Sequence, residues 1–158
     1  MVKQRTQVGR MRETNKLSLT RTINVEYRQE IPDELLLAIK EHVEASLHFL
    51  PRWCCLLIVK WNLGESFTLS VTTSVSNRWI KLYVHPGFFE DSPEERQVAI
   101  YHEFIHAYLA PMADVFEVVV GETEEAVRDI LWKWWKDALE CSVEDLARRF
   151  QEERSGVS

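Results

Sequence analysis

The chain has 158 residues, of which 46% are hydrophobic and 28% are charged. This length and balance favour one soluble globular domain with a sizeable core, and exclude a mainly disordered chain or a collagen-like repeat. Three cysteines, two of them adjacent, exclude a disulfide scaffold. No apolar run approaches the roughly 18–20 residues of a membrane span and no secretory signal is recognisable, so we expect a cytoplasmic protein.

The formal net charge of −6 is divided unevenly along the chain. Residues 1–22 contain six Lys or Arg against one Glu, so they carry +5, and the remaining thirteen basic and twenty-four acidic residues give −11. A basic arm could contact nucleic acid, but this arm lacks the interleaved aromatic residues that stack on bases. We therefore expect residues 1–22 to form a solvated, flexible arm, or one that lies on its own body. Residues 23–154 are expected to form a single domain.

The first half of the chain predicts one helix and several strands. Alternating residues at 21–27 predict a strand, and apolar residues at helical spacing predict a helix over 31–50, ended by Pro51. Three more segments predict strands: the apolar run 53–61 and the alternating segments 67–75 and 79–84.

The second half predicts helices. The first spans residues 92–110, with Ser92 as its N-cap and Pro111 after its end. Residues 121–140 form the second, and residues 142–153, capped by Ser142, the third. The order of elements predicts an α+β domain with a small, mostly antiparallel sheet packed on these helices.

A metal-binding pattern, HEFIH, lies on the predicted helix 92–110. His102 and His106 are four residues apart, so their imidazoles share one helix face and can converge on one ion, as tetrahedral zinc requires. Glu103 is turned away from them around the axis, which places its carboxylate beside a zinc-activated water, where it can act as general base.

A third protein ligand is needed, and no histidine follows His106. Carboxylates of the predicted helix 121–140 remain. Glu125 and Asp129 are four residues apart on one stripe of an otherwise apolar helix, where burial is costly without a cation. Glu122 and Glu124 are alternatives, although acidic residues are also favourable at any helix N-terminus.

The sequence HEFIH followed by EEAVRDI resembles the gluzincin clan of zinc metallopeptidases, which includes thermolysin. The resemblance covers residues 79–129 and implies a minimal zincin-like fold. It implies one Zn²⁺ per chain held by His102, His106 and Glu125, with Glu103 as catalytic base. Asp129 would then accept a hydrogen bond from a liganding imidazole.

Only 29 residues follow Asp129, so we expect the C-terminal subdomain of larger gluzincins to be missing. In this the chain is similar to small predicted metallopeptidases of bacteriophages and bacteria. That subdomain supplies a transition-state stabiliser, for which His85, Tyr108 and Arg128 are candidates here. Without the resemblance, we would expect His85 to be a surface histidine at the end of a strand and Tyr108 to be a residue of the hydrophobic core.

The expected function is hydrolysis of peptide bonds in a protein or peptide that pairs with the edge strand 79–84, with no membrane partner. The alternative is a catalytically silent zinc-binding module for regulation or protein interaction. The missing subdomain favours this alternative, whereas the intact Glu103 argues against it. Trp132, Trp134 and Trp135 are expected to be core packing with a partly exposed aromatic, with a partner-binding patch as the alternative.

Overall fold

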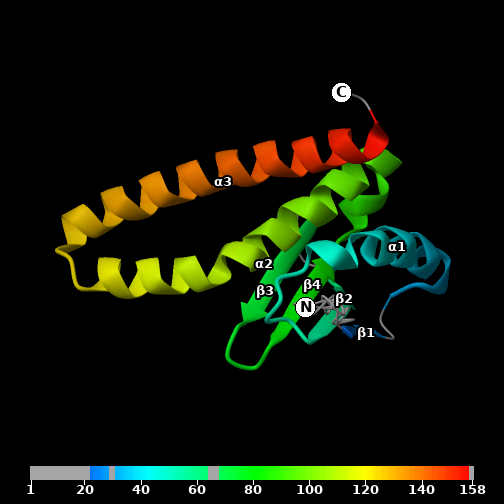
Figure 1. Cartoon of the computed structure of the whole chain (residues 1–158), viewed down its shortest axis with the longest axis horizontal. Helices are drawn as coiled ribbons and strands as arrows, with labels where there is room; N and C mark the ends of the chain where they lie inside the picture. Colours follow the sequence, from blue (N-terminus) through cyan, green and yellow to red (C-terminus); the bar gives the residue numbers. More distant parts are fainter. Residues whose placement is uncertain (1–21, 29–30, 64–67, 157–158) are drawn as a thin grey trace, which may run out of the picture.

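The computed structural model describes residues 22–28, 31–63 and 68–156, so the expected basic arm lies almost wholly outside the described residues. The elements are listed here in chain order: β1 (Asn24–Tyr27), α1 (Asp33–Ser46), a short 3-10 turn η1 (Leu47–Phe49), β2 (Leu56–Trp61), β3 (Leu69–Ser74), β4 (Trp79–Val84), a second turn η2 (Pro86–Phe89), α2 (Pro93–Gly121) and α3 (Glu125–Ser155). The fold class is α+β, as expected (Figure 1).

The strands form one mixed sheet in the order β1-β2-β4-β3. β2 pairs in parallel with both β1 and β4, and only the β3–β4 pair is antiparallel. The expectation of a mostly antiparallel sheet is therefore wrong. The β1–β2 pair is parallel because α1 lies between the two strands in the chain and carries the chain back to the edge where β1 began, as a parallel crossover requires.

The position of β4 corrects a second expectation. β4 lies inside the sheet between β2 and β3, so it is not an edge strand. The edge on this side of the sheet is β3, and β3 packs beside α2.

One face of the sheet packs on α1 and α2. Alternate residues of β4 are buried, because side chains of a strand point to opposite faces in turn. They share one hydrophobic core with residues of β2, α1 and α2; its main members are Ile39, Val43, Leu57, Val59, Ile80, Leu82, Val84, Ile100 and Phe104. Because Phe104 is fixed in this core, the neighbouring Glu103 lies on the flank of α2 that borders β3.

α2 and α3 form a long antiparallel hairpin that extends past the sheet (Figure 1). α2 does not end before Pro111 as expected but continues to Gly121 with the proline inside it. α3 is one helix where two were expected. Ser142 does not cap a new helix; its hydroxyl donates to the Ala138 carbonyl at 2.8 Å, as serines inside helices do.

α2 is also long and apolar enough to cross a membrane, by length and composition alone. The sequence reading expected no such segment. Only 22% of the apolar stretch that meets this test is buried, although the first half of α2 packs in the hydrophobic core.

Candidate metal centre

Two imidazoles and one carboxylate converge where α2 and α3 face each other. The Nε2 atoms of His102 and His106 are 3.0 Å apart, and each is 3.4 Å from the same carboxylate oxygen of Glu140. The ligand atoms of these three residues all lie within 4.8 Å of one another. They are therefore close enough to bind one metal ion.

The size of this triangle agrees with a tetrahedral zinc site. Two donors at 2.0–2.1 Å from a tetrahedral ion lie roughly 3.3 Å apart, and the three distances here are 3.0 and twice 3.4 Å. Two histidines and one glutamate are also a donor set of catalytic zinc sites, which keep a fourth position open. The residues present thus fit this ion.

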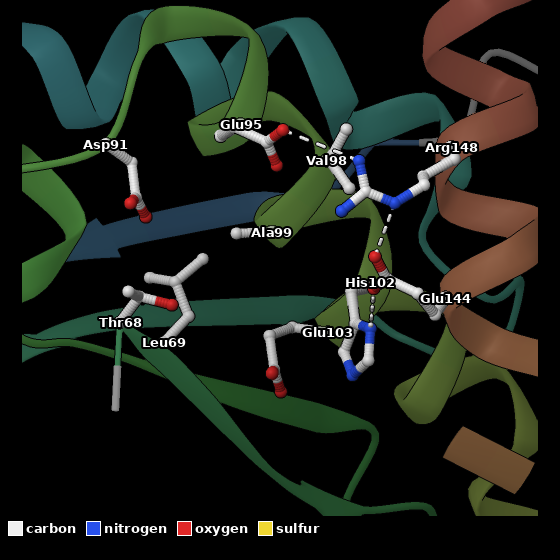
Figure 2. A pocket seen from close by; sticks show the side chains of 10 residues that line it. All are labelled: Thr68, Leu69, Asp91, Glu95, Val98, Ala99, His102, Glu103, Glu144 and Arg148. Carbon is white, nitrogen blue, oxygen red and sulfur yellow. Dashed lines mark hydrogen bonds and ion pairs between the residues drawn. The ribbon is translucent and has the colours of Figure 1, made fainter. Parts of the chain in front are cut away.

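A hydrogen bond to Glu144 and two ion pairs of Arg148 support His102 (Figure 2). Its Nδ1 lies 3.2 Å from a Glu144 oxygen, and the other Glu144 oxygen lies 2.6 Å from Nε of Arg148. Arg148 also reaches Glu95 at 3.4 Å. Because a carboxylate only accepts, Nδ1 of His102 carries the proton and the Nε2 lone pair stays available for a metal.

Glu103 lies beside the triangle without belonging to it. Figure 2 shows its carboxylate beside the His102 ring, and Glu103 is one of the residues that line the cavity drawn there. Burial raises the pKa of Glu103 to about 7, and the nearby Glu140 carboxylate also raises it, against a backbone hydrogen bond from Val71 that lowers it. Burial lowers the pKa of His106, an effect that Glu140 opposes.

The triangle opens into a cleft of about 510 Å³ between β3 and the helical hairpin. Its floor carries Glu103 and both histidines, Glu140 lies on the α3 side, and one wall is the edge strand β3. An adjoining cavity of about 300 Å³ extends past His102 toward Arg148. A backbone edge and a potential metal centre thus face each other across one cleft.

The structure does not bring Glu125 and Asp129 to the histidines. Both are exposed in the first turns of α3. Fifteen residues separate His106 from the end of α2, and α3 returns over fifteen residues from Glu125 before it reaches Glu140. At 1.5 Å per residue Glu125 is roughly 22 Å away along the helix. Glu140 and Glu144, also four residues apart, occupy the places expected for Glu125 and Asp129.

None of the three expected transition-state stabilisers lines this cleft. His85 is fully buried rather than at the surface, and its Nε2 lies 3.3 Å from the Ser70 hydroxyl. Tyr108 is 62% exposed, not core, and lines a separate apolar cavity of about 540 Å³. Arg128 donates to the carbonyls of Gly121 and Thr123, both at 3.0 Å, and so fastens the turn between α2 and α3.

Sequence reasoning missed Glu140, Glu144 and Arg148. A usable signal was present, since these residues repeat at intervals of four in ECSVEDLAR and so share one helical face. The expected break at Ser142 hid it, because that break assigned Glu140 and Glu144 to different helices.

Comparisons with known proteins add no assignment. The chain matches no protein-family model, no curated protein and no solved structure.

Proposed function

We propose that this protein is a zinc-dependent metallopeptidase. The observation that carries the proposal is the triangle of His102, His106 and Glu140, with donor separations of 3.0–3.4 Å and a non-ligating carboxylate, Glu103, beside it. A purely structural zinc site has four protein ligands and no use for an adjacent base. This set of three ligands and a base supports catalysis.

Zinc in such a site lowers the pKa of a bound water toward roughly 7 and polarises a carbonyl. Glu103 would accept the proton from the water and pass it to the leaving amine. Glu144 would hold the His102 ring in the tautomer that leaves Nε2 free, and Arg148 would hold Glu144. Each residue thus has a distinct role.

The proposed substrate is an extended peptide in the cleft. β3 pairs with β4 on one side only, so main-chain groups on its other side could pair with a peptide, apart from the Val71 N–H, which donates to Glu103. β3 replaces residues 79–84 in this role, since β4 is internal. Pairing along β3 would lead a peptide past Glu103, which the Val71 backbone contacts.

A catalytically silent zinc-binding module is the second candidate. It is favoured by the positions of His85, Tyr108 and Arg128, none of which reaches the cleft to stabilise an oxyanion. The two functions differ in what they require of Glu103, which only the peptidase needs.

The decisive experiment combines metal analysis with a peptide library. Purified protein should contain one zinc per chain and cleave library members. Glu103→Gln should keep the zinc and lose at least the roughly 10²–10⁴-fold that general-base catalysis contributes. Glu117→Gln is the matched control, because Glu117 is exposed on the same helix outside the cleft. Zinc without any cleavage would favour the silent module, and protein that binds no zinc would refute both candidates.

A further inference from the structure

The far part of the helical hairpin, residues 108–138, exposes an unusual amount of apolar surface; we call it the outer hairpin. Of the eleven large hydrophobic residues that are exposed among the described residues, eight lie here. They are Tyr108, Met112, Val115, Val118, Val119, Val127, Ile130 and Trp134. Scattered apolar residues are normal on a surface, whereas such a concentration marks an interaction site.

These residues follow a regular spacing on α2. Tyr108, Met112, Val115 and Val119 are separated by four, three and four residues, the spacing of one helix seam. Each comes directly before a more shielded residue; these are Leu109, Ala113, Phe116 and Val120, of which Phe116 contacts Trp132 and Trp135 of α3. One position is about 100° around a helix, so α2 carries a second seam beside the one that α3 covers.

α3 repeats this arrangement. Val127, Ile130 and Trp134 are exposed. The residue directly after each of them is more shielded; these are Arg128, Leu131 and Trp135. Trp135 stacks on Phe116 of α2, with ring centroids 4.5 Å apart, which fixes the shielded seam as the one between the helices.

Because the two helices are antiparallel, the same one-residue offset turns both exposed seams to the same side of the hairpin. The seven residues therefore form one apolar face, two helices wide, which we call the outer face. The residues that come directly after the shielded ones lie on the other side of the hairpin. They include charged residues, such as Glu117 on α2 and Lys136 on α3. That polar side continues into the cleft, so the outer face points away from the metal centre.

We propose that the outer face binds the outer face of a second copy of this chain, forming a four-helix bundle. A two-helix face with seam spacing on both helices is half of such a bundle. The seven residues are 45–69% exposed, so their solvent-accessible surface is roughly 800 Å² in total. A standard protein interface also buries roughly 800 Å² on each partner. The same patch on both partners is the arrangement of a two-fold dimer.

The charge of the outer hairpin argues against a lipid surface as the occupant. Residues 108–138 contain three basic and seven acidic residues, for a net charge of −4. Helices that lie on membranes carry Lys and Arg on their polar face, which attract anionic headgroups, and this hairpin would be repelled. A span through the membrane would bury Asp114 and Glu117 in hydrocarbon.

The test measures the mass of the full chain in solution by sedimentation velocity over a concentration series. Wild type should be a dimer, and Val119→Glu should raise the dissociation constant at least 100-fold. Val118→Glu is the matched control: Val118 is 70% exposed against 61% for Val119, but it lies about 100° around the helix. It should change the constant less than 5-fold.

Val127→Glu, on the other helix of the outer face, should dissociate the dimer as Val119→Glu does. The melting temperature of each monomeric variant at low concentration should match wild type, since these side chains are exposed in the monomer. A wild type that is monomeric throughout, or equal effects of Val118→Glu and Val119→Glu, would overturn the proposal. A monomer that binds phosphatidylcholine vesicles, with binding lost in Val119→Glu, would replace it with a lipid surface. These readouts require no zinc and no cleavage, so they are independent of the proposed function.

Discussion

The two halves of the α2–α3 hairpin differ in what lies behind them. In the sheet-backed half, residues 93–107 and 139–155, α2 has the sheet on one side and α3 on the other. In the outer hairpin the two helices pack mainly on each other, and only its inner end, at Leu109, Ala110 and Ala113, still borders the core or the cleft. Nine of the eleven buried residues of α2 and α3 belong to the sheet-backed half, and so do all three residues of the metal triangle.

This difference shows where a helix can support chemistry. Imidazoles and carboxylates must be held to a fraction of an ångström, which requires packed neighbours and hydrogen bonds to the ligating groups. His102 has both, with Tyr101 buried before it and Glu144 bonded to its ring. The outer hairpin offers exposed surface instead, which suits association. One continuous pair of helices thus carries two different kinds of site.

The largest expected effect compares two phenylalanines of α2. Phe104 is fully buried against the sheet, whereas Phe116 is partly exposed and packs on Trp132 and Trp135. Phe104→Ala should destabilise the fold by about 3–5 kcal/mol, because it leaves a closed cavity. The space left by Phe116→Ala is open to solvent, so this substitution should lower the free energy of unfolding by only about 1–2 kcal/mol. Urea unfolding measures both, and equal losses would contradict the distinction between the two halves.

The next effect separates Glu140 from Glu125. Glu140→Gln removes a charged ligand and should weaken zinc binding by more than the ~10–100-fold typical of a supporting residue. Glu125→Gln should leave the affinity unchanged, since Glu125 is exposed in the outer hairpin. Competition with a chromogenic chelator measures both constants. If Glu125→Gln proved the damaging change, the third ligand would come from the start of α3 after all.

A smaller effect concerns the support of His102. Glu144→Gln should reduce zinc affinity about 10–100-fold, because the amide no longer holds the ring as firmly. Asp145→Asn is the neighbouring control, since Asp145 pairs with Arg149 at 3.0 Å and faces solvent. Asp129→Asn should also have no effect. Equal zinc affinities in wild type and Glu144→Gln would assign Glu144 to the Arg148 ion pair alone.

Much of the fold could be predicted from the sequence because the relevant signals are local. Alternation identified the segments that form β1, β3 and β4, and the Ser92–Pro93 start of α2 was correct, with the Ser92 hydroxyl accepting from the Glu95 N–H at 3.2 Å. Strand direction is not local. The parallel β2–β4 pair joins segments that have β3 between them in the sequence, which no alternation pattern reveals.

Half of the candidate site was likewise predictable. His102 and His106 are four residues apart, so any helix brings them together. Which residue of α3 lies opposite the histidines depends on the length of α2. The antiparallel α3 must cover the same length that α2 extends beyond His106 before it reaches them. The prediction of Glu125 rested on its stripe with Asp129 and on the gluzincin resemblance, and the expected end of α2 before Pro111 gave no reason to look further along α3. Pro111 removes one hydrogen bond and usually ends or kinks a helix, but here α2 continues through it.

The smallest effect tests whether one helix joins the two halves. If Ser142 capped a separate helix, Ser142→Ala would destabilise the protein by about 0.5–2 kcal/mol. In a continuous α3 the substitution should instead be neutral or stabilising by up to about 0.5 kcal/mol, since alanine is the better residue inside a helix. Ser92→Ala is the matched control, because Ser92 caps α2 and should cost about 1 kcal/mol. The opposite signs can be separated by thermal unfolding of the two variants beside wild type. A loss in Ser142→Ala as large as that in Ser92→Ala would mean that α3 is broken at Ser142, so that Glu144 and Arg148 stand on a different helix from Glu140 and the outer hairpin.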